Sequence, residues 1–180
     1  MEDFKKNRLI YFPGYGSDER SGTYRYLQKH FGAENMACIR YDNADAEQAW
    51  QQIVEQIDTL KQASETLFII GSSLGGYWAN RTANHFHLPF VLINPSTNPS
   101  VTLAKYGVGP EHLEKFGPSP TEVPPRFIIL GENDDVIDPQ RANALFGNKT
   151  RIIWVNDGHR LNGQHKKVLV AELRALPELQ

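Results

Sequence analysis

The sequence predicts an α/β fold in which one mostly parallel sheet carries helices on both of its faces. Two observations lead to this class. Short apolar runs typical of strands recur along the 180 residues, and segments with helical periodicity separate most of them. Strands that alternate with helices form parallel sheets, because each helix returns the chain to the starting edge of the sheet. The ligand of such a sheet lies beyond the carboxyl ends of its strands.

The expected strands are short apolar segments, each bounded by polar or turn-forming residues. In chain order they are residues 9–12, 36–41, 66–70, 90–93, 127–130 and 151–155.

Three segments place their apolar side chains three or four residues apart, so each predicts an amphipathic helix. One lies between the second and third strands, one follows the third strand, and one lies near the carboxyl end. Their apolar positions are Ala46, Trp50, Ile53, Ile57 and Leu60; Leu74, Trp78, Thr82 and Phe86; and Val168, Leu169, Leu173 and Leu176.

One long segment breaks the alternation between the fourth and fifth strands. Residues 95–125 hold seven of the 11 prolines and have helical character only around 110–116. Irregular segments of this length in compact domains are commonly lids or binding loops. We therefore expect a small cap over the functional site. No linker is visible, so residues 1–180 are expected to form a single domain.

The composition narrows the class of protein further. A net charge of −2 without a cluster of basic residues argues against nucleic acid and membranes as partners. The neighbouring Lys166 and Lys167 fit a solvated helix face. The single cysteine, Cys38, lies in an apolar run and is expected to be a buried, inert thiol. No secretory signal or apolar run of roughly 20 residues is present, which predicts a cytoplasmic protein. Nothing in the pattern indicates an oligomeric state.

The most specific motif lies where the third strand meets the following helix. Gly71, Ser73 and Gly75 form a G-x-S-x-G pentapeptide after an apolar run. This pattern is typical of a nucleophile elbow, a tight turn that lifts the serine hydroxyl out of the sheet toward a base. Ser73 is therefore the candidate nucleophile.

A base and an acid follow in the order that an α/β-hydrolase requires. The loop 131–139 follows the fifth strand and is rich in acids, and Gly158-His159 follows the sixth strand. The other five histidines belong to helical segments or their ends, and His165 is expected to be an exposed polar residue. His159 is therefore the candidate general base.

The acid is not settled by the local pattern. Asp138 precedes Pro139 and suits a helix N-cap. Asp157 is explained by the turn that it forms with Gly158. Asp134 and Asp135 both remain candidates for the triad acid.

The loop after the first strand completes the expected site. Its Gly-rich sequence around Tyr15 would present backbone N–H groups, and the amides of Tyr15 and Leu74 are the predicted oxyanion hole. The pocket is expected to include Tyr15, Tyr77 and Leu161. Ser72 is expected to point away from the site, and Ser17 to shape the first loop.

Other ligand-binding motifs are absent from the sequence. A dinucleotide fingerprint beginning at Gly14 would need a third glycine where Glu19 stands, and no P-loop or metal-ligand spacing occurs. We therefore expect neither a cofactor nor a metal.

The wider pattern resembles the YqiA/YcfP-like family of small bacterial α/β-hydrolase esterases. The motifs that carry the resemblance are Tyr11-Phe12-Pro13-Gly14-Tyr15, Gly71-Ser72-Ser73-Leu74-Gly75-Gly76-Tyr77, Asn94-Pro95, Asp134-Asp135-Val136-Ile137-Asp138 and Gly158-His159. The resemblance implies the α/β-hydrolase fold, Asp134 as the triad acid, and hydrolysis of short-acyl carboxylic esters. The family often has His-Gly-Phe in the first loop where this chain has Pro-Gly-Tyr, which bears on pocket shape.

The expected function is therefore that of a serine esterase, with a small-molecule ester as its partner and Ser73, His159 and Asp134 as its triad. Two alternatives stay open. One is a non-catalytic ligand- or protein-binding module on a hydrolase scaffold. The other is a thioesterase or acyltransferase that uses the same triad.

Overall fold

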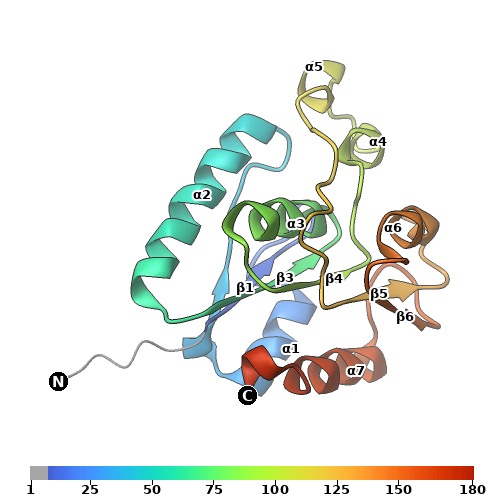
Figure 1. Cartoon of the computed structure of the whole chain (residues 1–180). Helices are drawn as coiled ribbons and strands as arrows, with labels where there is room; N and C mark the ends of the chain where they lie inside the picture. Colours follow the sequence, from blue (N-terminus) through green and yellow to red (C-terminus); the bar gives the residue numbers. More distant parts are fainter. Residues whose placement is uncertain (1–7) are drawn as a thin grey trace.

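The computed structural model describes residues 8–180, and its centre is a six-stranded sheet in which all strands are parallel (Figure 1). The strand order is β2-β1-β3-β4-β5-β6. The strands are β1 (Arg8–Phe12), β2 (Met36–Cys38), β3 (Leu67–Ser72), β4 (Phe90–Ile93), β5 (Phe127–Gly131) and β6 (Arg151–Val155).

Helices cover both faces of this sheet, and each face has its own hydrophobic core (Figure 1). On one face, side chains of α2, α3 and α6 pack against the strands, and on the other face those of α1 and α7 do so. The helices are α1 (Gly22–Phe31), α2 (Ala46–Ala63), α3 (Leu74–Phe86), α4 (Pro99–Ala104), α5 (Pro110–Leu113), α6 (Pro139–Phe146) and α7 (Gly163–Arg174), with short 3₁₀ turns at Ala33–Asn35 and Pro177–Leu179. The predicted α/β-hydrolase fold class is confirmed.

The predicted second strand, 36–41, is too long. Pairing with β1 ends at Cys38, and beyond it the N–H and the carbonyl of Arg40 both bond to the side-chain amide of Gln56 on α2. The Ile39 N–H still donates to the Tyr11 carbonyl at 2.9 Å, but no further residue of this segment pairs with β1. The backbone of Arg40 is thus held by α2 and not by the sheet, which the strand pattern did not reveal.

The order of the strands determines where the elbow lies. From β1 the chain passes to β2 on one side and then crosses to β3 on the other. The loops that follow β1 and β3 therefore meet at the carboxyl edge of the sheet, which is the usual ligand position in such folds. A Cβ atom added to Gly14 would lie 3.0 Å from the Ser73 Cβ, so the two loops are in close contact.

Gly75 makes that contact sterically feasible. A Cβ atom at Gly75 would lie 2.1 Å from the carbonyl oxygen of Phe12 and 2.4 Å from that of Pro13. Because both obstacles are backbone atoms at the end of β1, Gly75→Ala must push α3 away from the first loop. We expect the free energy of unfolding to fall by about 3 kcal/mol.

Urea unfolding followed by circular dichroism would measure this loss. The matched control is Gly163→Ala at the start of α7, where an added Cβ meets no atom within 4 Å. Its stability should change by no more than about 1 kcal/mol. Equal effects of the two substitutions would show that Gly75 is not tightly packed.

The segment between β4 and β5 contains α4 and α5, which lie above α3 in the view of Figure 1, with α5 farther from it than α4. The second half of this segment lies along α3: the Tyr77 hydroxyl donates to the Gly117 carbonyl at 3.0 Å, and Asn80 Nδ2 to that of Pro120 at 2.9 Å. Phe116 packs on Trp78 in the same interface. Much of the insertion therefore extends the core over α3. The short helix α4 was not predicted.

Cys38 at the end of β2 is half-buried, and burial raises the pKa of its thiol to about 12. Only the thiolate is nucleophilic, so at pH 8 we expect iodoacetamide to react at least about tenfold more slowly with Cys38 than with an ordinary thiol, even though a more basic thiolate is intrinsically more reactive. Mass spectrometry of alkylation time courses would measure this rate. Protein unfolded in guanidinium is the control, and equal rates in both states would contradict an inert thiol.

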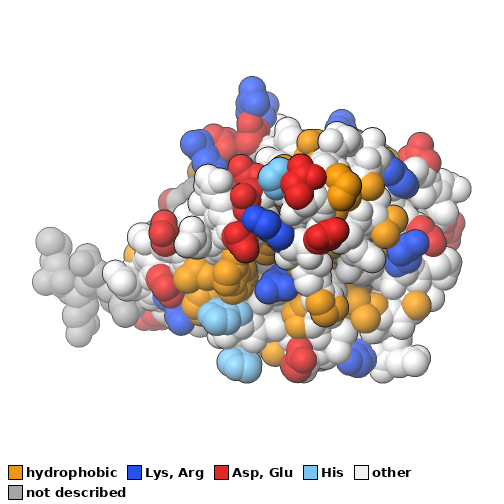
Figure 2. Space-filling model, turned by 90° about the horizontal axis from the view of Figure 1, so that it is seen from above, with side chains coloured by type: hydrophobic (Ala, Val, Ile, Leu, Met, Phe, Trp, Pro, Cys, Tyr) orange, Lys and Arg blue, Asp and Glu red, His pale blue; other side chains and the backbone are white. Residues whose placement is uncertain are grey.

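The surface over α2, α3, α4 and α5 carries both signs of charge. Figure 2, which views the molecule from that side, shows Lys and Arg interspersed with Asp and Glu. Neither sign gathers into one continuous area on this face. Within residues 8–180, no helix has the length and apolar character needed to cross a membrane.

Candidate active site

Ser73 occupies the turn between β3 and α3 with a positive φ of 57° and a ψ of −126°. A non-glycine residue adopts this conformation only when its surroundings impose it. Here the Ser73 N–H donates to the Ile93 carbonyl at 3.1 Å, and the Ser73 carbonyl accepts from the N–H groups of Gly76 and Ser96 at 2.9 Å each. These bonds hold the turn, and the strained backbone is the geometry of a nucleophile elbow.

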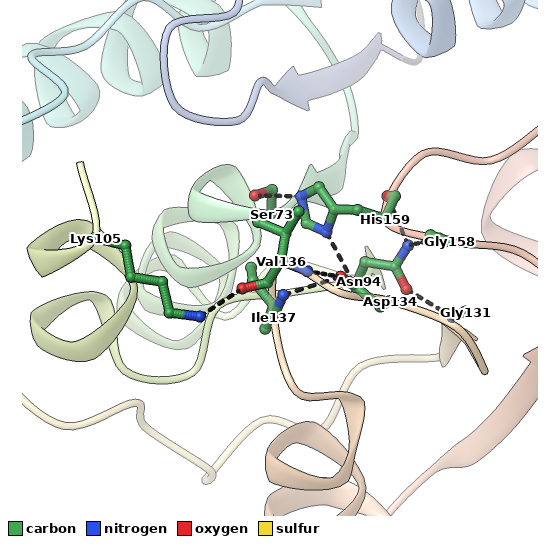
Figure 3. Close-up of polar contacts among 9 residues, drawn as sticks. All are labelled: Ser73, Asn94, Lys105, Gly131, Asp134, Val136, Ile137, Gly158 and His159. Atoms are coloured by element: carbon green, nitrogen blue, oxygen red, sulfur yellow. Dashed lines mark hydrogen bonds and ion pairs between the residues drawn. The ribbon is translucent and has the colours of Figure 1, made fainter.

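Three side chains from separate loops form one hydrogen-bonded chain at this edge of the sheet (Figure 3). The Ser73 Oγ lies 2.9 Å from His159 Nε2, and His159 Nδ1 lies 2.8 Å from Asp134 Oδ2. The Asp134 side chain is only 1% exposed and that of His159 17%. A buried carboxylate thus orients an imidazole that reaches the serine hydroxyl.

The acid loop holds Asp134 through its second oxygen. Asp134 Oδ1 accepts the N–H groups of Val136 and Ile137, each at 2.9 Å, while Oδ2 faces His159 (Figure 3). Asp135 is exposed, and Asp138 caps α6 through the N–H of Gln140 as expected. Of the two acids left open by the sequence, the structure brings Asp134 to the histidine.

Asp157 forms its hydrogen bond with His165 and not with His159. Its Oδ2 lies 2.9 Å from His165 Nδ1 and accepts the Asn162 N–H at 2.7 Å. Burial raises the pKa of Asp157, but the Asn162 N–H and the His165 ring outweigh it and hold the pKa below its usual value. The expectation that His165 is exposed is wrong, because its side chain is only 16% exposed in this pair.

Asn94 is a residue of this site whose role the sequence did not reveal. It follows β4, is 1% exposed and has a positive φ of 42°. Its Oδ1 accepts the Gly131 N–H at 2.7 Å, and its Nδ2 donates to the carbonyls of His159 at 2.8 Å and Gly158 at 3.3 Å (Figure 3). One amide thus ties the loop bearing the acid to the loop bearing the base. Its signals in the sequence were its place directly after a strand and the Asn94-Pro95 pair of the family resemblance, and neither indicated this role.

The two amides expected to form an oxyanion hole are both available. Within residues 8–180, neither the Tyr15 N–H nor the Leu74 N–H donates to a protein acceptor. The segment between β2 and α2 holds the first loop in place: the Tyr41 hydroxyl donates to the Pro13 carbonyl, and the Gly16 N–H donates to Asn43 Oδ1 at 2.9 Å. Two free donors beside an activated serine suit a developing oxyanion.

A cavity of about 660 Å³ opens beside Ser73 and His159. Tyr15 and Leu161 line it, as the sequence predicted, and Ser72, expected to point away, borders it as well. The remaining residues around it come mainly from the first loop, the start of α1 and the start of α7. They are Tyr11, Gly14, Gly16, Ser17, Asp18, Arg20, Ser21, Gly22, Thr23, Ile93, Tyr106, Arg160 and Lys166.

Two expectations about the cavity are wrong. Tyr77 does not line it, because its ring is 1% exposed and packs on Trp78 and Phe116 under the insertion. Of residues 95–125, only Tyr106 borders the cavity, where its ring stacks on Tyr15 with centroids 4.8 Å apart. The insertion therefore contributes a wall and not a cap.

In the described part of the chain, no three His, Cys, Asp or Glu side chains gather in a way that could hold a metal ion.

Solved structures share this architecture. The mouse α/β hydrolase domain-containing protein 10 superposes with a TM-score of 0.78 at 14% identity, covering 94% of this chain and 89% of that one. XC6422 of Xanthomonas campestris, described as an α/β serine hydrolase without a lid, superposes with a TM-score of 0.58 at 14% identity over 97% of this chain and 83% of that one. Both similarities show that this chain has the fold of these proteins.

Sequence relatives identify the family. A UPF0227 protein of Pectobacterium carotovorum is 25% identical, and the UPF0227 protein YcfP of Escherichia coli is 24% identical, each over 81% of this chain and 86% of its own length. The profile of the uncharacterised protein family UPF0227 matches residues 8–116, which is more than half of the chain. The resemblance to YcfP-like proteins is thereby confirmed, and the chain belongs to the UPF0227 family.

Proposed function

We propose that the protein is a serine esterase that hydrolyses small carboxylic esters in the cytoplasm without a cofactor. The observation that carries the proposal is the unbroken chain from Ser73 Oγ through His159 to Asp134, with its two contacts of 2.9 and 2.8 Å. Hydrogen-bonded neighbours of this kind turn a weakly nucleophilic hydroxyl into a nucleophile. The free N–H groups of Tyr15 and Leu74 would polarise the ester carbonyl and stabilise the oxyanion that forms from it.

The geometry supports acyl transfer in two halves. As Ser73 Oγ attacks the ester carbonyl carbon, His159 Nε2 takes its proton and the carbonyl oxygen becomes an oxyanion held by the two amides. Collapse of this intermediate breaks the carbon–oxygen bond to the alcohol, which leaves with the proton from His159. Water then attacks the acyl-enzyme and gives its proton to His159, and as the carbon–oxygen bond to Ser73 breaks, His159 returns that proton to Ser73 Oγ and the acid is released.

The shape of the site favours small esters. Only Tyr106 of the insertion borders the cavity, so the insertion does not enclose a long acyl chain against the serine. A cavity of about 660 Å³ still has room for a short acyl group and a modest alcohol. XC6422, the serine hydrolase described as lidless, shares the architecture of this chain, which is consistent with an uncovered site.

Hydrolysis of p-nitrophenyl acetate and butyrate by the purified protein tests the proposal directly. Intact-mass spectrometry after treatment with a fluorophosphonate should show a single adduct, and peptide mapping should place it on Ser73. The corresponding thioester and anilide separate an esterase from a thioesterase or an amidase. No turnover and no adduct would favour a binding module on a hydrolase scaffold.

A further inference from the structure

Basic side chains gather around the candidate active-site cavity, although the whole chain has a net charge of −2. Arg20, Arg160 and Lys166 border the cavity, and Asp18 is the only acid that does so among the described residues. Asp18 forms an ion pair with Arg20 at 2.6 Å, and Arg20 holds the pKa of this carboxyl at about 2. Because the Asp18–Arg20 pair has no net charge, the residues that border the cavity carry two net positive charges, those of Arg160 and Lys166.

Neither of these two cations has a carboxylate partner within residues 8–180. Every ion pair described for the chain involves other basic residues. Arg160 is exposed and directly follows the candidate base, His159. An unpaired cation that borders the cavity attracts an anionic ligand, because no carboxylate of the described residues pairs with it.

Lys166 lies nearer to the cavity wall than its place in a predicted solvated helix face suggested. It lies half-buried on α7, whereas its neighbour Lys167 is exposed, so the expectation that both belong to a solvated face is wrong for Lys166. Its Nζ approaches the start of α1, where it lies 3.3 Å from the position of a Cβ added to Gly22. Gly22 and Thr23 also border the cavity.

The start of α1 adds donors to the same wall. Within the described residues, the N–H groups of Gly22 and Thr23 make no hydrogen bond to the protein, since the Ser21 side chain caps only the Tyr24 N–H. Free amides and a lysine that face one space suit the oxygens of a carboxylate or a phosphate. The stacked rings of Tyr15 and Tyr106 provide an apolar surface elsewhere in the cavity.

We propose that the substrate of this site is an anionic ester, whose carboxylate or phosphate group binds between Lys166, Arg160 and the start of α1 while its ester carbonyl lies at Ser73. This inference rests on the proposed esterase function and specifies its substrate class. The anion is not chemically changed in the reaction. It positions the ester, so the charge affects KM more than kcat.

Matched esters test the proposal and separate the two sources of negative charge. On the alcohol side, 4-methylphenyl acetate is neutral, 4-acetoxybenzoate carries a carboxylate and 4-acetoxyphenyl phosphate carries a phosphate. On the acyl side, phenyl hexanoate is compared with monophenyl adipate. Each kcat/KM is divided by the rate of hydroxide-catalysed hydrolysis, which removes differences in leaving group. We expect an anionic ester to be preferred about tenfold in at least one series, as for a hydrogen bond to a charged group.

Variants connect the preference to the cavity. Lys166→Ala should remove most of the preference mainly through KM, Lys166→Arg should keep it, and Lys166→Glu should reverse it. Lys167→Ala is the matched control on the same helix and should change nothing. Raising NaCl from 0.05 to 0.5 M should also weaken the preference, because salt screens exposed charges.

The outcomes distinguish the two proposals. Equal turnover of neutral and anionic esters, or a preference that survives Lys166→Glu, overturns the anionic subsite but leaves the esterase. Absence of turnover for every ester overturns the esterase. In that case calorimetric binding of benzoate and phenyl phosphate, compared with p-cresol, still tests the subsite in the wild-type protein and in Lys166→Glu. Equal binding of all three ligands would refute it.

Discussion

Replacing Ser73 with alanine is expected to lower kcat for p-nitrophenyl butyrate by a factor of about 10⁵ to 10⁶, which is the loss typical of removing a triad nucleophile. The hydroxyl is the atom that forms the acyl-enzyme, and its 2.9 Å contact to His159 Nε2 has no substitute in the variant. The amides of Tyr15 and Leu74 remain, so a small residual rate above that in water is expected. Initial rates at saturating substrate measure the loss.

The change should leave the fold intact. Ser73 is held by its backbone hydrogen bonds, which alanine retains, although its positive φ stays strained. The matched control is Ser64→Ala at the end of α2, a buried serine whose Oγ has no partner in the described residues. Its activity should match that of the wild type. If Ser73→Ala kept a tenth of the activity, the reaction would have to proceed by direct attack of water, and the acyl-enzyme would be excluded.

The sequence located the elements of the site because they depend on local rules. A strand that turns through small residues into a helix is visible at Gly71 and Gly75, and the acid and base follow strands at the same edge of the sheet. Parallel strands place the loops that follow them along one edge of the sheet, whatever their separation in the chain. Loops far apart in the chain were therefore expected to meet around Ser73, and the structure places them there.

Predictions that depended on the exact direction of a side chain were less reliable. The periodicity of α3 indicated one apolar face, but the helix is buried on nearly all sides because the insertion covers the rest of it. Tyr77 accordingly points into the core and not into the cavity. Lys166 and Asn94 gain their positions from contacts with α1 and with the 131–139 and 158–159 loops, and no local pattern encodes such contacts.

The choice between Asp134 and Asp135 belongs to the same class, because neighbouring residues in a loop differ only in direction. Asp134→Asn is expected to lower kcat by about 10⁴, the cost of fixing the wrong tautomer of a triad histidine. Asp135 is exposed, so Asp135→Asn should stay within about twofold of the wild type, as for a surface substitution. The two variants differ from the wild type by the same chemical change at adjacent positions.

The geometry explains why the asparagine at position 134 should be harmful even though it fits. The Oδ1 position accepts the N–H groups of Val136 and Ile137, so the amide oxygen must stay there and the amide nitrogen must face His159. An N–H that donates to Nδ1 forces the imidazole proton onto Nε2. In that tautomer the ring donates to Ser73 Oγ and is unable to accept its proton. A large loss in Asp135→Asn with little change in Asp134→Asn would transfer the orienting role to Asp135 and contradict the 2.8 Å contact as the functional one.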